Sequence, residues 1–274
     1  MVAGASPQYG GGMLNSIRGL GSFLVESTTG AGFTIHLLFH SAFQWGALFR
    51  RHYIDSILRQ MFICGIQTIP VTMVVSIFTG AILALNGGIT LEEIGQESLM
   101  GRIVTVSMTR EMGPFMTALI LAASVGSGMA AEIATMKVSE ETDALQVMAV
   151  DPARFLVFPR LLAMAIMTPV LTVYTNLVGI LGGAIVSAYQ YGVSLMRFKT
   201  EAFLYLTAKD IYTGILKAFI FGVVIAIVGC SEGLRATRGA LGVGQATRKA
   251  VVISYLLIIV LGYYVTFVFF RINW

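Results

Sequence analysis

The chain has 274 residues, of which 56% are apolar and only 12% are charged, with a formal net charge of +4. A soluble domain carries roughly 25% charged residues, so this chain has about half the charge that a water-exposed surface requires. The composition excludes a soluble globular domain and indicates one integral membrane domain over residues 1–274, with no nucleic-acid partner.

The N-terminal part divides into two segments. Residues 1–26 are rich in Gly and Ser and are predicted to be flexible. In the segment 27–52, His36, His40 and Gln44 recur at helical spacing and share one face. This pattern favours an N-terminal interfacial helix that lies in the membrane plane, although a spanning helix is the alternative. A metal pair would need a third ligand, which the segment lacks.

Five later segments are long and apolar enough to cross a bilayer, which takes ~20 residues. They are Met61–Leu85, Ile103–Ala131, Leu161–Met196, Ile211–Ser231 and Ala250–Phe270. Backbone groups in hydrocarbon must be paired within their own segment, so these spans are predicted to be helices. The predicted fold is therefore all-α, with about five transmembrane helices, the interfacial helix and a cytoplasmic helix after the second span.

The basic residues set the expected orientation. Arg and Lys gather in the N-terminal segment, after the second span and after the fourth, whereas Glu92, Glu93 and Glu97 follow the first span. By the positive-inside rule, the N-terminus is predicted to be cytoplasmic and the C-terminus to lie outside.

Enzymatic and nucleotide-binding motifs are missing from the sequence. It contains no G-x-x-x-x-G-K-[ST] loop, no H-E-x-x-H and no C-x-x-C. The glycine-rich run at 239–244 follows no strand and is predicted to be a flexible turn. We expect a non-enzymatic chain with no catalytic residue, metal or cofactor, in which any ATP is bound by a partner.

One pair of charges stands inside the second span. An ionised side chain at the bilayer centre costs about 2.5–3.5 kcal/mol on insertion scales. Arg110 and Glu111 point ~100° apart on a helix, so each should find a partner on another helix or line a polar cavity. Interfacial anchoring is the alternative. Pro114 leaves the carbonyl of Arg110 without its helical donor and permits a bend.

The segment from Glu132 to Asp151, here called the elbow, separates the second and third spans. It mixes acidic residues with many apolar ones and ends at Asp151-Pro152. A short amphipathic helix over 132–151 that docks on a partner is predicted. A plainly solvated loop is the alternative.

Several ordered motifs carry a family resemblance. They are R-E-M-G-P at 110–114, A-A-E-I-A-T-M-K-V-S-E-E-T-D-A-L at 130–145, M-A-V-D-P at 148–152, P-R at 159–160, C-S-E-G-L-R at 230–235 and V-G-Q-A-T-R-K-A-V-V at 243–252. In these motifs the chain resembles the MlaE-type (YrbE) permeases, the membrane subunits of lipid-transporting ABC systems.

The resemblance implies a homodimer in the bacterial inner membrane, with a periplasmic C-terminus, above two ABC ATPase subunits. It further implies an MCE-domain protein on the outer side, in some systems a STAS-domain protein, and phospholipid as the cargo. A sterol or another hydrophobic substrate is the alternative. A stand-alone secondary transporter would show internal repeats, and none is evident.

The resemblance also implies roles for individual residues. The elbow would be the coupling helix, with ATPase contacts at Glu132, Met136, Lys137, Glu140 and Asp143. The lipid cavity would be lined by Arg110, Glu111, Leu83, Leu91 and Ile94. Two positions depart from the family pattern, because Ser124 stands where the family has Arg and Gly262 where it often has an acid. Small residues such as Gly126, Gly128, Gly179 and Gly182 permit close helix packing, either across the dimer or within one subunit.

Overall fold

The computed structural model describes residues 51–237 and 239–271, together with residues 32, 34 and 37. Within these residues all regular structure is helical, which confirms the all-α prediction. In chain order the helices are α2 (Arg51–Cys64), α3 (Ile69–Glu93), α4 (Met100–Ser107), α5 (Gly113–Leu121), α6 (Ser127–Val138), α7 (Glu141–Val147), α8 (Phe158–Tyr191), α9 (Leu195–Tyr205), α10 (Ala208–Leu234) and α11 (Gly239–Arg271). The predicted flexible segment and nearly all of the interfacial helix lie outside the described residues.

Five helical stretches of the described chain are long and apolar enough to span a membrane, as predicted. They are Ile54–Glu93, Glu97–Val138, Phe155–Tyr191, Ala208–Leu234 and Gly239–Arg271. The second stretch contains two π-helical turns, Met108–Met112 between α4 and α5 and Ala122–Gly126 between α5 and α6. A third π-helical turn, Ala153–Val157, precedes α8.

The first span differs from the prediction at its start. The segment predicted as one helix from Met61 to Leu85 is divided between α2 and α3. A Cβ at Gly65 would overlap the end of the Met167 side chain on α8, so a larger residue there would require that side chain to move. Pro70 then occupies the first turn of α3, where a missing backbone donor costs nothing.

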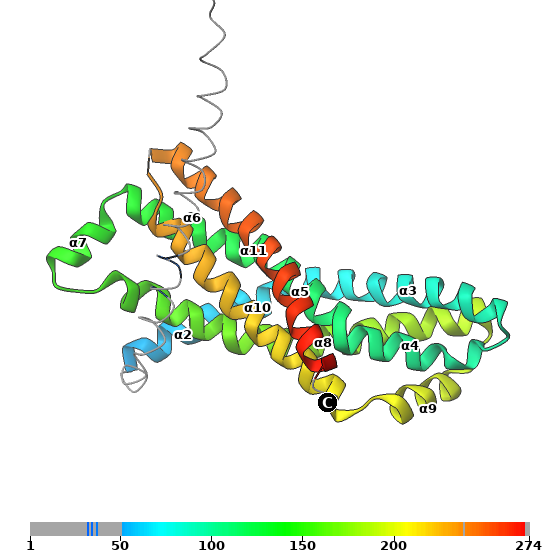
Figure 1. Ribbon diagram of the computed structural model, residues 1–274. Coiled ribbons are helices and arrows are strands. Elements are labelled where there is room, and N and C mark those ends of the chain that lie inside the picture. Colours follow the sequence, from blue (N-terminus) through cyan, green and yellow to red (C-terminus); the bar gives the residue numbers. More distant parts are fainter. Residues whose placement is uncertain (1–31, 33, 35–36, 38–50, 238, 272–274) are drawn as a thin grey trace, which may run out of the picture.

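The helices form an elongated bundle (Figure 1). Helix α3 lies along α8, while α10 packs against α6, α8 and α11. The elbow with α7 projects at one end, and α9 with the α3–α4 connection lies at the other. The elbow and the α3–α4 connection are thus held at opposite ends of the apolar helices.

Close helix contacts rely on the small residues that the sequence singled out. A Cβ at Gly80 of α3 would overlap the carbonyl oxygen of Gly179 of α8, and one at Gly182 would lie 2.5 Å from the oxygen of Ile77. Gly126 likewise faces Ile225 of α10. These glycines serve packing within one subunit, whereas a Cβ at Gly128 would meet nothing within 4 Å.

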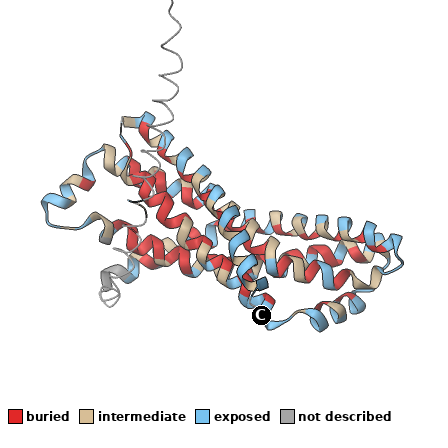
Figure 2. Cartoon of the chain, in the orientation of Figure 1, coloured by how far each residue is buried: buried red, intermediate tan, exposed pale blue. Residues whose placement is uncertain are grey.

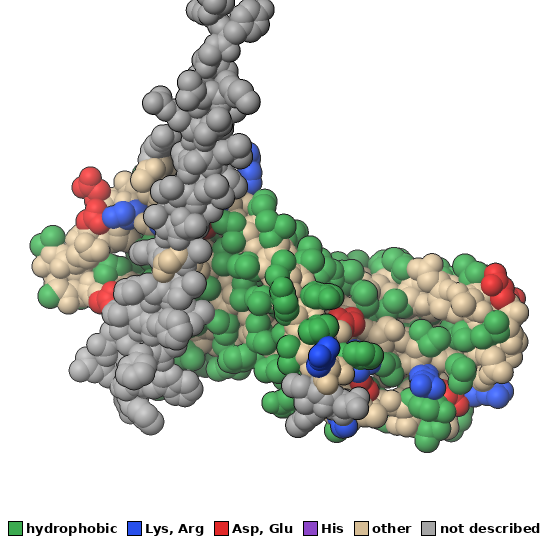
Figure 3. All heavy atoms as spheres, in the orientation of Figure 1, with side chains coloured by type: hydrophobic (Ala, Val, Ile, Leu, Met, Phe, Trp, Pro, Cys, Tyr) green, Lys and Arg blue, Asp and Glu red, His purple; other side chains and the backbone are tan. Residues whose placement is uncertain are grey.

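Burial follows the pattern of a lipid-facing bundle. Buried residues line the contacts between helices, and exposed residues follow the outer faces (Figure 2). Many of the exposed residues are large and apolar, including Phe78 of α3, Leu181 of α8 and Tyr263 of α11. Hydrophobic side chains cover much of the central face (Figure 3). Apolar surface of this extent requires lipid or another protein against it.

Candidate functional site

A π-helical turn presents the charged pair of the second span. Arg110 and Glu111 lie in the turn Met108–Met112, immediately before α5. Pro114, in the first turn of α5, has no N–H with which to reach the carbonyl of Arg110. That carbonyl instead accepts a hydrogen bond from Nζ of Lys217 at 3.1 Å. The predicted effect of Pro114 is thereby confirmed, and it joins the turn to α10.

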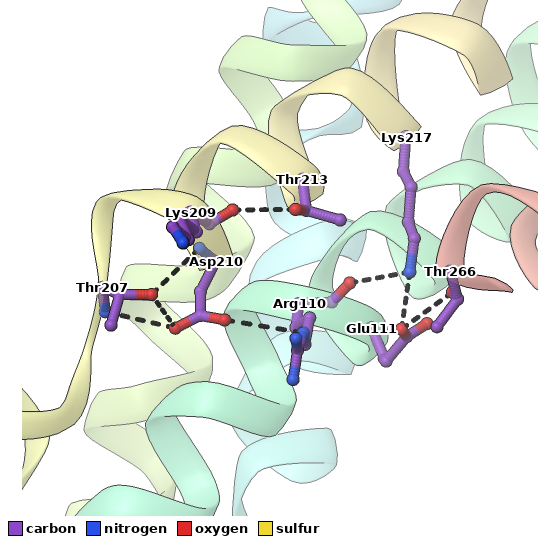
Figure 4. A network of polar contacts seen from close by, with 8 residues as sticks. All are labelled: Arg110, Glu111, Thr207, Lys209, Asp210, Thr213, Lys217 and Thr266. Carbon is purple, nitrogen blue, oxygen red and sulfur yellow. Dashed lines mark hydrogen bonds and ion pairs between the residues drawn. The ribbon is translucent and has the colours of Figure 1, made fainter. Parts of the chain in front are cut away.

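Glu111 connects three helices. Its Oε1 lies 2.6 Å from Nζ of Lys217 on α10 and accepts a hydrogen bond of 3.0 Å from the hydroxyl of Thr266 on α11 (Figure 4). Only 1% of the Lys217 side chain is exposed, against 40% of Glu111. A buried ammonium is tolerated when an opposite charge and further acceptors surround it. Glu111 therefore neutralises Lys217 while keeping part of its own carboxylate accessible.

Arg110 reaches α10 at a different point. Its Nε lies 3.5 Å from Oδ1 of Asp210, and the Arg110 side chain is 47% exposed. Asp210 also forms a capping box with Thr207 at the start of α10, through its other oxygen, Oδ2 (Figure 4). The prediction that each charge finds its own partner on another helix is confirmed, and both partners lie on α10. We call Arg110, Glu111, Asp210, Lys217 and Thr266 the Arg110 network.

Sequence reasoning did not assign Asp210, Lys217 or Thr266 to the site. Lys217 is the one charged residue of the predicted span Ile211–Ser231, so the rule that singled out Arg110 and Glu111 applies to it equally. Asp210 carried the signal of a Thr-x-x-Asp cap. Thr266 carried none, because a threonine in an apolar helix usually bonds its own backbone.

Two of the three apolar residues predicted for the lipid cavity belong to one apolar cluster. Leu91 is buried in a cluster with Met100, and Leu83 packs against the same cluster. Ile94 follows α3 and is exposed. Met100 precedes Arg110 by roughly 15 Å of helix. The same cluster continues to Met108 and Met112 of the π-helical turn, so Leu83 and Leu91 share an apolar core with that turn, and their role as cavity lining stays a prediction.

The elbow is two helices where one was predicted. Helix α6 ends at Val138, a turn follows, and α7 runs from Glu141 to Val147. Glu140 has a φ of 61° in the left-handed region, which ends the first helix and redirects the chain. Nζ of Lys137 lies 2.6 Å from Oδ1 of Asp143 and bridges the turn. The single amphipathic helix over 132–151 is therefore corrected to two helices joined by a turn.

The predicted coupling residues take different positions in the elbow. Lys137 and Asp143 pair with each other, Met136 is half-buried, and Glu140 is exposed at the turn. Glu132 lies at the base, where its Oε2 is 2.8 Å from Nη2 of Arg160. The tip is apolar, with Val147 89% exposed.

Both departures from the family pattern place an uncharged residue where the family has a charged one. Ser124 donates a hydrogen bond to the carbonyl of Ile120 in its own helix. Gly262 lies one turn before Thr266, and a Cβ there would stand 3.3 Å from the ring of Phe221. The hydroxyl of Thr266 is within 2.8 Å of the Gly262 carbonyl.

Comparison with known proteins gives one consistent result. The sequence profile of the family described as Permease MlaE matches residues 57–268. A probable ABC transporter permease protein of Rickettsia conorii is 39% identical over 220 residues, which is 80% of this chain and 85% of that protein. One from Synechocystis is 35% identical over 78% of this chain and 81% of its own length. The chloroplastic protein TRIGALACTOSYLDIACYLGLYCEROL 1 of Arabidopsis thaliana is 32% identical over 78% of this chain and 61% of its own length.

Proposed function

The chain belongs to the MlaE permease family, and from that premise we propose that it moves phospholipid between the bacterial inner membrane and a periplasmic MCE-domain partner. It is a multi-pass membrane permease subunit, and its relatives are named ABC transporter permeases. In the proposal two copies form a homodimer over two ABC ATPase subunits, which bind the ATP. A STAS-domain protein on the ATPase completes some assemblies.

The Arg110 network is the observation that carries the choice of phospholipid. Charges within spans usually mark the path of a polar group through the membrane. Arg110 and Glu111 keep about half of their side chains accessible although they lie in apolar helices. The guanidinium of Arg110 suits a phosphate, and the surrounding apolar faces suit acyl chains. A sterol has no phosphate and would leave Arg110 without a ligand group. The name of the Arabidopsis relative also refers to a glycerolipid.

The elbow is the proposed contact with the ATPase. Its tip offers exposed Val147 and Met148, with Glu140 nearby at the turn. Apolar side chains rimmed by charge are typical of a small docking surface. In this arrangement the elbow lies in the cytoplasm, which agrees with a cytoplasmic N-terminus and, after five spans, a periplasmic C-terminus.

The test is reconstitution of the chain with its proposed ABC ATPase partner. We expect co-purified phospholipid in the mass spectrum of the complex and an ATPase rate that changes when phospholipid is supplied. A complex that contains no lipid and hydrolyses ATP at the same rate with and without lipid would refute the proposal. A bound sterol in place of phospholipid would select the alternative substrate.

A further inference from the structure

A polar pocket, separate from the Arg110 network, lies at the elbow end of the bundle. It has a volume of about 180 Å³ and is lined in part by Ser56, Arg59 and Gln60 of α2, Glu132 of α6 and Arg160 of α8. Glu132 follows Glu111 by roughly 30 Å of helix, so this elbow pocket is separate from the Arg110 network. This volume is room for several water molecules or a small polar group.

Arg160 is an incompletely paired cation at this pocket. Only 5% of its side chain is exposed. Its Nη2 contacts Glu132 and its Nη1 donates to the carbonyl of Leu156, but its Nε–H has no acceptor among the described residues. A buried donor without an acceptor is unfavourable, and such groups in folded proteins usually have a partner. The Arg160 guanidinium therefore has capacity for one more anionic oxygen.

Arg59 supplies a second cation. It forms no ion pair with any residue that the structure describes, and it lines the same pocket. Two arginines against the single carboxylate of Glu132 leave the pocket with a net positive charge. The hydroxyl of Ser56 and the amide of Gln60 add neutral donors. The donors thus outnumber the acceptors, which is the composition of an anion site.

The surface beside the pocket is apolar. Leu58 and Phe62 of α2 are exposed and lie one turn apart on the helix, next to Arg59. Helices at the membrane boundary place apolar side chains in the acyl region and basic ones at the headgroups. Leu58 and Phe62 would therefore contact the acyl chains of a lipid whose headgroup phosphate reaches Arg59.

We infer that the elbow pocket binds the phosphate of a phospholipid resident on the elbow side of the membrane. This lipid is not the transported one, because the pocket is separate from the Arg110 network. Glu132 lies within α6, the helix that enters the elbow, and Arg160 lies in the first turn of α8, the helix that follows it. A phosphate shared by Arg59 and Arg160 would join α2 to both arms of the elbow and hold them in place. The inference rests on the membrane location of the chain and not on the identity of its cargo.

The experiment is photolabelling of the full-length chain in nanodiscs without ATPase. The probe is a phosphatidylglycerol with a photoreactive group near the glycerol, and labelled peptides are mapped by mass spectrometry. We expect labelling of the peptide that contains Leu58 and Phe62, and a decrease of about tenfold in Arg59→Gln, because one charge-assisted contact is lost. The matched control is Arg197→Gln, an exposed arginine of α9 at the opposite end.

Two further measurements identify the chemical group that the pocket binds. A photoreactive diacylglycerol with the same acyl chains has no phosphate and should label this peptide weakly. Glu132→Gln removes the competing carboxylate and should raise labelling by phosphatidylglycerol. Equal labelling of Arg59→Gln and wild type would overturn the inference. Suppression by millimolar inorganic phosphate would show a free-phosphate site instead and overturn the lipid assignment.

A last variant separates this inference from the proposed function. Arg110→Gln removes the cation proposed for the cargo and should leave labelling at the elbow pocket unchanged. If elbow labelling persists while the complex shows no lipid-dependent ATPase activity, the proposed function fails and the inference stands. If labelling disappears in Arg110→Gln, the two sites are one and the inference fails.

Discussion

The difference in burial between Lys217 and Glu111 gives the sharpest test of the Arg110 network. Lys217 is almost fully buried, whereas Glu111 is 40% exposed. Glu111→Gln leaves a buried ammonium without its counter-charge, a change that costs about 3–5 kcal/mol for buried pairs. We expect about 3 kcal/mol, since solvent at the exposed carboxylate already weakens the pair. Lys217→Met keeps the volume, removes the buried charge and leaves Glu111 with Thr266, at a cost of about 1 kcal/mol or less.

The two cysteines provide the assay. Cys64 and Cys230 are free and buried, so a thiol-reactive fluorophore reports thermal unfolding in detergent. At about 2–4 °C per kcal/mol, Glu111→Gln should lower the midpoint by roughly 6–12 °C and Lys217→Met by only a few degrees. The double variant should be more stable than Glu111→Gln alone, because it contains no unpaired buried charge. Equal losses in the single variants that add in the double variant would refute the reasoning.

Three other outcomes follow from the structure. Arg110→Ala should reduce lipid transfer by the reconstituted complex about tenfold. Co-purification with the ATPase should stay at the wild-type level, because Asp210 keeps its capping contact with Thr207 at the start of α10. An unchanged transfer rate would show that Arg110 is only an anchor. Glu140→Lys should weaken ATPase association in a pull-down with membrane insertion intact, because the side chain is exposed and unpaired in the elbow; a wild-type yield of complex would contradict the docking role. Gly80→Ala should lower the free energy of unfolding by about 3 kcal/mol, because the added Cβ would meet the backbone of Gly179. Gly128→Ala should be neutral or stabilising by up to ~1 kcal/mol, because nothing lies near its Cβ. Similar unfolding midpoints for the two variants would exclude the tight α3–α8 contact.

The spans could be predicted from sequence because a chain in hydrocarbon must pair all of its backbone polar groups internally. Apolar runs of sufficient length must be helices, and the five predicted runs fall within the five observed stretches except for the end of the third, at Leu195–Met196. Charges inside such runs are conspicuous for the same reason, which is why Arg110 and Glu111 stood out. Their partners on α10 depended on the rotation of one helix against another. That rotation is set by packing among α5, α8 and α10, which the composition of a span does not encode.

The elbow shows a different limit. Its apolar periodicity correctly indicated helix, but the reversal at Glu140 occurs at a residue with no special preference for the left-handed region. The pair Lys137–Asp143 can bridge α6 and α7 only after the turn has formed. The glycine-rich run at 239–244, predicted to be a flexible turn, is instead the start of α11. There a Cβ at Gly242 would overlap the carbonyl of Thr237, so packing requires the glycine within the helix.

The attachment of the π-helical turn to α10 constrains how motion at the elbow can reach the Arg110 network. Arg110 holds Asp210 at the start of α10, and Glu111 holds Lys217 two turns later. The helical stretch from α5 through α6 connects this turn directly to the elbow, and Gly126 brings it against α10 on the way. Sliding of α6 along α10 would separate both ion pairs and expose a buried ammonium, so such sliding is costly. A displacement of the elbow should therefore move α5, α6 and α10 as one body, and the movement should be taken up where this body meets α3 and α8.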